Sequence, residues 1–298
     1  MKNPFEILIE VIDLWKVFGA PPNTDVREAV ELAKQEKKNG LVCAVRAVSF
    51  QVRRGEVFVI MGLSGSGKST LIRCLARLIE PSSGQVLVNG RDVVSMGSQS
   101  LTEFRRREIA MVFQHYGLLP HRTVLENVHF GLKLRGEKRA AREEKAIEVI
   151  QQVGLSGWEN HYPHQLSGGM RQRVGIARAL VQDTEILLMD EPFSGLDPLI
   201  RREMQDELLR LQKEFQKTII FVTHDLSEAL RLGNRMAVMK EGSFVQIGTP
   251  GEIVANPADD YVRRFVQDER KLMHLQEGKV EHLNLKRDHL QSLKNVMP

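Results

Sequence analysis

Several short runs of consecutive apolar residues occur along the chain. The clearest runs lie at residues 57–61, 185–190 and 218–223, and a shorter one lies at 236–239. Runs of this kind are typical of strands buried on both faces of a sheet. Apolar and polar residues alternate near residues 5–12 and 48–52, which predicts two further strands.

Between these runs, apolar residues recur at helical spacing. They predict a helix over residues 69–78, directly after the 57–61 strand, and another over 201–213. The alternation of strands and helices predicts an α/β fold with a mostly parallel central sheet. Ligands of such sheets bind at the carboxyl ends of the strands, so the residues that follow each strand carry most of the functional information.

The pattern changes between about residues 115 and 180. Strand-like runs disappear there, which predicts an inserted helical subdomain within an ATP-binding domain of residues 1–267. Three helical stretches make up this part: 124–134, 139–153 and 170–181.

Two other segments lie outside this alternation. Residues 20–40 form a polar insert, and residues 268–298 form a charged tail that we expect to be helical. No uninterrupted apolar run approaches the roughly 20 residues that a membrane span requires.

The composition narrows the class of protein further. The chain has 298 residues, of which 42% are hydrophobic and 27% charged, enough to build a core of one large or two small domains. The formal charge is only +4, so no nucleic-acid partner is implied. Cys43 and Cys74 form no disulfide framework or metal pattern, which fits a reduced cytosolic setting.

Residues 62–70 read Gly-Leu-Ser-Gly-Ser-Gly-Lys-Ser-Thr, the pattern of a phosphate-binding loop. Backbone N–H groups of such a loop point inward toward phosphate, and the following helix adds the positive end of its dipole. A chance match in a glycine-rich turn is the alternative, but the strand before and the helix after favour a true loop. We expect ATP to contact Gly62, Ser64, Gly65, Ser66, Gly67, Lys68, Ser69 and Thr70.

Within that loop, Lys68 is expected to contact the β- and γ-phosphates, and the Ser69 hydroxyl to coordinate Mg²⁺. Asp190 and Glu191 end the 185–190 strand. We expect Asp190 to hold Mg²⁺ and Glu191 to orient or deprotonate the attacking water. The alternative is a pair of charges at the start of a helix beside Pro192.

A second anion site is predicted at residues 166–170, Leu-Ser-Gly-Gly-Met, directly before the 170–181 helix. Ser167 and the N–H groups of Gly168 and Gly169 would lie at the N-terminus of that helix, where a γ-phosphate binds well. The simpler alternative is a serine that only caps the helix.

Taken in order, these motifs resemble the ATPase subunits of ATP-binding cassette (ABC) transporters, over about residues 5–267. The resemblance implies that Phe18 stacks on adenine and that Gln114 takes part in catalysis and metal binding. It further implies that the segment 194–197 is a D-loop whose Asp197 contacts nucleotide, and that His224 contacts the γ-phosphate.

The same resemblance implies a P-loop NTPase fold with an antiparallel β subdomain beside the central sheet. It implies a head-to-tail homodimer in which each ATP lies between the phosphate loop of one chain and residues 167–169 of the other. The partners would be an integral membrane permease subunit and, indirectly, a substrate-binding protein. The chain would work peripherally at the cytoplasmic face of the inner membrane.

The chain also resembles the cassettes of glycine betaine/proline importers in the insert at 20–40 and in the sequences of residues 59–70 and 105–121. This implies a compatible-solute cargo such as glycine betaine, proline or choline. Those cassettes often precede a tandem CBS pair, whereas about 31 residues follow residue 267 here, so we expect no CBS module. An ATPase for polar amino-acid import and a soluble ABC ATPase without a transport role remain the alternatives.

Overall fold

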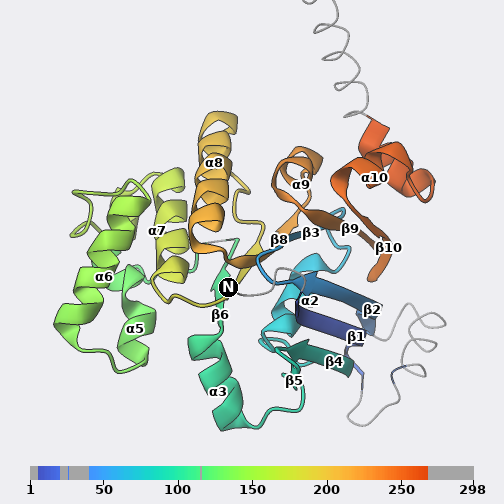
Figure 1. Cartoon of the computed structure of the whole chain (residues 1–298), viewed down its shortest axis with the longest axis horizontal. Coiled ribbons are helices and arrows are strands. Elements are labelled where there is room, and N and C mark those ends of the chain that lie inside the picture. Colours follow the sequence, from blue (N-terminus) through green and yellow to red (C-terminus); the bar gives the residue numbers. More distant parts are fainter. Residues whose placement is uncertain (1–5, 21–25, 27–39, 115, 268–298) are drawn as a thin grey trace, which may run out of the picture.

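The structure is a computed structural model that describes residues 6–20, 26, 40–114 and 116–267 (Figure 1). The tail at 268–298 and nearly all of the insert at 20–40 lie outside the described residues. In the part of the chain that is described, no helix is long and apolar enough to cross a membrane.

The larger sheet has six strands in the order β10-β9-β3-β8-β7-β6, and every neighbouring pair is parallel except β9 and β10. This arrangement is the mostly parallel central sheet that the apolar runs predict. Every residue of β3, β7 and β8 is buried. The strands are β3 (Val57–Met61), β6 (Ile109–Val112), β7 (Ile186–Asp190), β8 (Thr218–Thr223), β9 (Arg235–Lys240) and β10 (Ser243–Gly248).

A smaller antiparallel sheet lies beside it, with strand order β2-β1-β4-β5. The strands predicted at 5–12 and 48–52 are present but longer than the sequence pattern indicates. The bounds are β1 (Ile7–Phe18), β2 (Val42–Arg53), β4 (Ser83–Val88) and β5 (Arg91–Asp92). Buried and exposed positions alternate along β1 and β2 only in part, because both strands contain register shifts.

The central sheet separates two apolar cores. Val57, Val59 and Met61 of β3 belong to the core shared with the inserted helices, whereas Phe58 and Ile60 belong to the core shared with the antiparallel sheet. The helices outside the insert include α2 (Lys68–Leu75), α3 (Ser98–Arg107), α8 (Pro198–Phe215), α9 (Leu226–Leu232) and α10 (Pro250–Ala255). Leu71 and Ile72 place α2 in the second core, between the two sheets.

The predicted inserted helices lie together at the left of Figure 1, on the opposite side from β1, β2 and β4. The helical stretch expected at 124–134 is present, but His129, with a ψ of 4°, divides it into α4 and α5. Helical hydrogen bonds continue across this residue, since the His129 N–H donates to the Leu125 carbonyl and the Lys133 N–H to the His129 carbonyl, both at 3.0 Å. The elements are α4 (Val124–Val128), α5 (Phe130–Leu134), α6 (Arg139–Gln152), η1 (Pro163–Gln165) and α7 (Gly168–Leu180).

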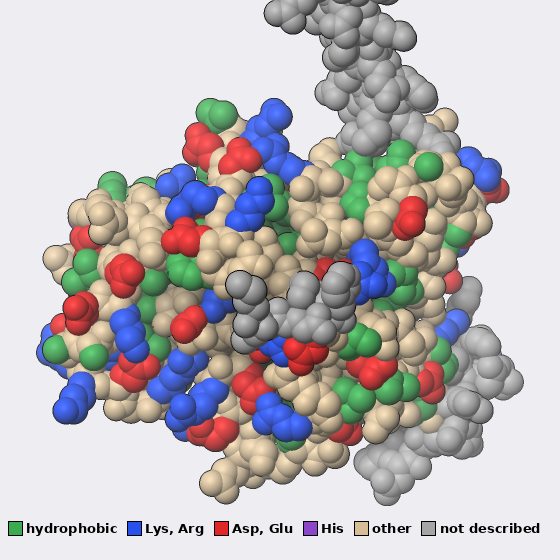
Figure 2. All heavy atoms as spheres, viewed as in Figure 1, with side chains coloured by type: hydrophobic (Ala, Val, Ile, Leu, Met, Phe, Trp, Pro, Cys, Tyr) green, Lys and Arg blue, Asp and Glu red, His purple; other side chains and the backbone are tan. Residues whose placement is uncertain are grey.

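Charge on the visible surface is mixed. On the face drawn in Figure 2, acidic and basic side chains are interspersed, in keeping with a formal charge of only +4. This side of the molecule therefore carries no single basic face.

Candidate functional site

The phosphate loop connects β3 to α2 as the sequence predicts. Gly67 precedes the first turn of α2 with a φ of 104°, and a Cβ there would lie 2.0 Å from the Ala44 carbonyl oxygen. Only glycine fits this conformation and this close approach. The loop therefore packs its backbone against β2, which fixes where the start of α2 points.

The Lys68 side chain is the cation at the centre of this loop. It is 4% exposed, and its Nζ donates to the carbonyl oxygens of Gly62 at 2.8 Å and Leu63 at 3.0 Å. Burial lowers the pKa of the Lys68 ammonium, while the carboxylates of Glu191 and Asp190 act in the opposite direction. The Lys68 Nζ lies 3.7 Å from Glu191 Oε1, so the ammonium has a carboxylate partner.

Asp190 and Ser69 form a pair at the end of β7. The Ser69 hydroxyl donates to Asp190 Oδ1 at 2.7 Å, and Arg73 donates to the other carboxylate oxygen at 3.0 Å. Asp190 itself is fully buried. A hydroxyl and a carboxylate oxygen beside a phosphate loop are the ligands that Mg²⁺ prefers, with water and phosphate completing its shell.

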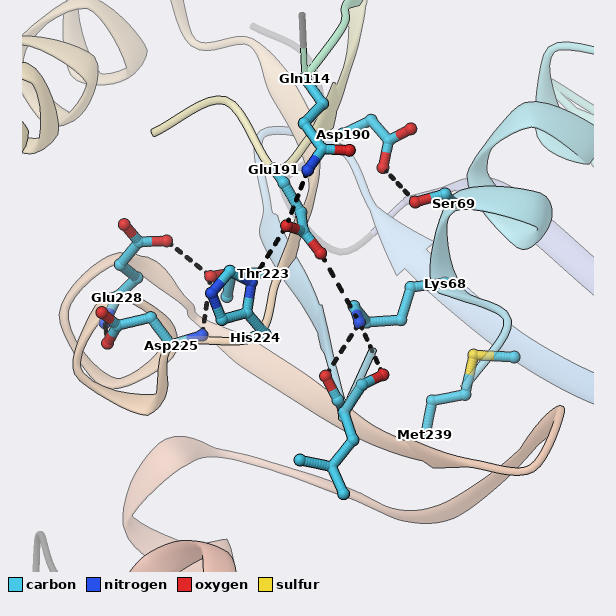
Figure 3. A network of polar contacts seen from close by, with 12 residues as sticks. Lys68, Ser69, Gln114, Asp190, Glu191, Thr223, His224, Asp225, Glu228 and Met239 are labelled. Atoms are coloured by element: carbon cyan, nitrogen blue, oxygen red, sulfur yellow. Dashed lines mark hydrogen bonds and ion pairs between the residues drawn. The ribbon is translucent and has the colours of Figure 1, made fainter. Parts of the chain in front are cut away.

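Glu191 collects three of the predicted residues around one carboxylate (Figure 3). Gln114 Nε2 donates to Glu191 Oε2 at 3.4 Å, and His224 Nδ1 lies 3.0 Å from the same oxygen. Gln114, Glu191 and His224 follow β6, β7 and β8, which are neighbours in the sheet. Their meeting at one edge follows from the parallel strand order, as expected for such sheets.

The turn at Glu191 is not the start of a helix. Its φ is 47°, an uncommon value for a residue with a side chain, and its N–H donates to the Val222 carbonyl at 3.0 Å. The alternative of two charges capping a helix is therefore wrong at this position. The backbone is instead shaped to hold the carboxylate toward Lys68.

A cleft of about 1070 Å³ lies over this site. Phe18 lines it with a side chain that is 39% exposed, and Lys16 Nζ lies 4.8 Å from the ring centroid. Other predicted residues also line the cleft: Ser64, Gly65, Gly67, Lys68, Ser69, Thr70, Gln114, Glu191 and His224.

Several lining residues were missed by the sequence analysis. Arg46 comes from β2, and Glu241 and Gly242 come from the turn between β9 and β10. The Gly242 N–H donates to the Ser66 carbonyl at 3.0 Å, so this turn supports the phosphate loop directly. These residues belong to no local motif, and only the register of strands distant in sequence brings them here.

Seven predicted residues do not line this cleft. Gly62, Ser66 and Asp190 are buried next to lining residues, whereas Ser167, Gly168, Gly169 and Asp197 belong to other segments. The Ser167 hydroxyl accepts from the Met170 N–H at 3.2 Å and caps α7, which is the simpler of the two expectations for it. Asp197 likewise caps α8, since its carboxylate accepts from the Ile200 N–H at 3.0 Å. Within one chain, the second predicted anion site and the phosphate loop are separate.

Comparison with known proteins agrees with this geometry. A family model described as "ABC transporter" matches residues 45–194. The chain belongs to the ABC transporter family. Its cassette is 30% identical to the ATP-binding cassette MJ0796, solved as a dimer in a post-hydrolysis state bound to ADP and Pi, with a TM-score of 0.70. The match covers 82% of this chain and 99% of that one, and it confirms the predicted P-loop NTPase fold.

Curated relatives of this ABC chain are transport ATP-binding proteins. It is 53% identical over 87% of its length to the glycine betaine/proline betaine protein of Escherichia coli (strain K12). It is 52% identical over 90% of its length to the glycine betaine protein of Bacillus subtilis (strain 168). The alignments cover 66% and 64% of those two proteins, slightly under two thirds of their length.

The alignment with a third relative covers a larger share of that relative's length. The trimethylamine N-oxide transport system ATP-binding protein of Pelagibacter ubique (strain HTCC1062) is 49% identical, over 88% of this chain and 77% of the relative. These three relatives are named for glycine betaine, proline betaine or trimethylamine N-oxide, and none of the three is named for a polar amino acid.

Proposed function

We propose that this chain hydrolyses ATP to power the import of a compatible solute of the methylated-amine class, such as glycine betaine. The observation that carries the ATPase proposal is the convergence of Lys68, Gln114 and His224 on the single carboxylate of Glu191. The cargo class is supported by the relatives, which are named for glycine betaine, proline betaine and trimethylamine N-oxide.

In this proposal the phosphate loop binds the triphosphate of ATP. Lys68 exchanges the Gly62 and Leu63 carbonyls for β- and γ-phosphate oxygens, which relieves part of the cost of burying its ammonium. Phe18 lies under the adenine ring. Glu191, at the γ-phosphate end, holds or deprotonates the attacking water, and His224 contacts the γ-phosphate.

Mg²⁺ belongs to the same proposal. The paired oxygens of Ser69 and Asp190 fit this ion, and Gln114 is a further ligand through its amide oxygen. When bound, Mg²⁺ would neutralise part of the negative charge on the transferring phosphoryl group.

A second copy of the chain completes the site. Ser167, Gly168, Gly169 and Asp197 lie outside the cleft of their own chain, and the first three lie at the N-terminus of α7, which favours anions. We infer that Ser167, Gly168 and Gly169 bind the γ-phosphate of ATP held by a partner chain, and that Asp197 contacts the same bound nucleotide. The related cassette MJ0796 is described as a dimer, which supports this arrangement.

We infer further partners from the names of the relatives, which are ATP-binding components of transport systems. An integral membrane permease would bind this chain at the cytoplasmic face of the inner membrane. A substrate-binding protein would deliver the solute to that permease without touching this chain.

Glu191→Gln tests the ATPase proposal. We expect kcat to fall by at least about 10²-fold because the amide cannot accept the proton of the attacking water. Binding of ATP should be retained, since Lys68 and the loop are unchanged. Glu148→Gln, an exposed position on α6, is the matched control. Near-normal turnover in Glu191→Gln would contradict the catalytic assignment.

The cargo is tested separately by uptake of labelled glycine betaine in cells with and without this gene. Loss of uptake on deletion supports the compatible-solute class. Unchanged uptake, in cells lacking other betaine systems, would reject that class and leave polar amino acids as the cargo to test.

A further inference from the structure

A buried carboxyl group lies next to the site without taking part in the proposed chemistry. Glu228, on α9, is 4% exposed. Its Oε2 accepts the Thr223 hydroxyl at 2.6 Å (Figure 3). Its Oε1 accepts from Gln205 Nε2 at 3.4 Å. Burial raises the pKa of this carboxyl, while the hydrogen bond from Thr223 opposes the rise. Burying a carboxyl group to this extent costs free energy unless hydrogen bonds compensate for the lost hydration.

The contacts of Glu228 surround His224 in the sequence. Thr223 precedes the histidine and Asp225 follows it. The Thr223 oxygen that donates to Glu228 also accepts from the Asp225 N–H at 3.0 Å. Asp225 Oδ1 in turn accepts from the Glu228 N–H at 3.3 Å. The main chain on both sides of His224 is therefore tied to one buried residue.

The histidine ring itself has little support. Its side chain is 56% exposed, and among the described residues its ring has one close polar contact, between Nδ1 and Glu191 Oε2 at 3.0 Å. An exposed ring has few packing contacts to hold its position. The direction in which it points must then come mainly from the main chain at residues 223–225.

Arg201, on α8, extends the same connection to the segment 194–197. Its Nη2 donates to the Leu196 carbonyl at 3.2 Å, and its Nη1 donates to Asp225 Oδ2 at 3.0 Å. Its Nε lies 3.8 Å from Glu228 Oε1. The segment predicted to contact a partner chain and the histidine are thus held by one set of polar contacts.

We propose that Glu228 and Thr223 are positioning residues that hold His224 against Glu191, an inference that rests on the proposed ATPase function. Neither residue lines the cleft, so they act through the main chain of the histidine. A displacement of a catalytic group by about 1 Å can lower a rate by about 10²-fold, so a missing hydroxyl at Thr223 has a measurable effect.

Thr223→Val tests the proposal because it removes the hydroxyl and keeps the shape. We expect kcat for ATP to fall by about 10-fold or more, with KM for ATP within about twofold of the wild type, since the phosphate loop is untouched. Thr223→Ser keeps the hydroxyl and should recover most of the rate.

Thr218→Val is the matched control. Thr218 is also fully buried, and it lies at the other end of β8, where its hydroxyl accepts from the Gly55 N–H at 2.8 Å. This variant should lower the melting temperature without changing kcat. An equal fall of kcat in Thr218→Val and Thr223→Val would overturn the positioning role, because a general loss of stability would then explain both.

A double-mutant cycle separates positioning from other effects. If Thr223 acts through His224, then Thr223→Val lowers kcat no further once His224→Ala is present. An equal additional loss in that background would overturn the inference. Should Thr223→Val fold poorly, Glu228→Met removes the acceptor instead and must give the same fall in kcat at unchanged KM.

The two proposals fail in different ways. A wild-type chain that hydrolyses no ATP would overturn the proposed function and this inference with it. An active wild type with unchanged kcat in Thr223→Val and Glu228→Met would overturn the positioning role alone.

Discussion

Phe18, the predicted adenine contact, is a partly exposed aromatic residue rather than a residue of the buried core. It lies at the end of β1, lines the cleft and remains 39% exposed. An aromatic side chain left this accessible beside a phosphate loop is well placed to stack on a base. Stacking of a base on an aromatic ring contributes about 1–3 kcal/mol.

Phe18→Ala should therefore raise KM for ATP by about 10-fold, with kcat nearly unchanged, as steady-state kinetics can measure. Phe18→Trp keeps an aromatic surface and should stay close to the wild type. Ile12→Ala is the control, because Ile12 is also on β1 and equally exposed at 39% but does not line the cleft. An unchanged KM in Phe18→Ala would reject the adenine contact.

Single site residues were predictable where a side chain with suitable chemistry lies at the end of a predicted buried strand or at the start of the helix after one. Ser69, Asp190, Glu191 and His224 each follow a buried strand or start the helix after one, so the parallel sheet brings them together. Arg46 had no such signal. Its place in the cleft depends on how β2 packs beside the turn after β9, and no local pattern encodes that contact.

Among the elements, strands of five or six residues that are buried throughout were the most predictable. The bounds of β3 and β8 match the predicted runs because both strands are buried on both faces and read as continuous apolar text. The edge strand β10 is only half-buried along its length, and α3 buries Phe104 alone, so neither shows a periodic stripe. Both were missed for that reason.

Within the helical insert, Asn127 joins a loop to the helix α4. It is fully buried, and its Nδ2 donates to the carbonyls of Leu119, Arg122 and Thr123 at 2.9–3.1 Å. Its Oδ1 accepts from the Leu119 N–H at 2.8 Å. One side chain thus satisfies four backbone groups of the segment that follows Gln114.

Asn127→Ala should lower the free energy of unfolding by about 1–3 kcal/mol, because the Leu119 N–H and the Arg122 carbonyl would lose this partner. The Leu119 and Thr123 carbonyls keep the N–H groups of Arg122 and Asn127. Urea denaturation measures this change. Asn160→Ala, at an exposed position in the same insert, should alter the free energy of unfolding by less than about 0.5 kcal/mol. A loss below about 1 kcal/mol in Asn127→Ala would mean that water replaces the amide.

At the scale of the whole molecule, the proposed ATP site consists of two segments that lie apart within one chain. The edge of the central sheet carries the phosphate loop and Glu191, whereas residues 167–169 start α7 in the helical insert and do not line that cleft. The sequence identified both segments, but spacing along the chain gives no distance between them. Only the packing of the insert on the central sheet sets that separation, and it leaves α7 with an N-terminus available to another chain.

This division makes dimerisation the sharpest test of the assembled site. The Glu191→Gln variant should form a dimer when ATP and Mg²⁺ are added, because in the proposed site ATP lies between two chains and this variant does not turn it over. Light scattering after size-exclusion chromatography measures the mass directly. A second substitution, Gly168→Asp, should keep the chain monomeric under the same conditions.

Gly168→Asp is suited to this test because the monomer tolerates it. A Cβ at Gly168 would lie 3.6 Å from the Tyr116 hydroxyl, an ordinary contact, and an acidic residue in the first turn of α7 favours the helix. Its negative charge would face the triphosphate bound to the partner chain and repel it. Gly251→Asp places the same charge in the first turn of α10, where a Cβ meets open space, and should leave the ATP-dependent dimer intact. A dimer that persists in Gly168→Asp would mean that α7 does not face the nucleotide of the partner.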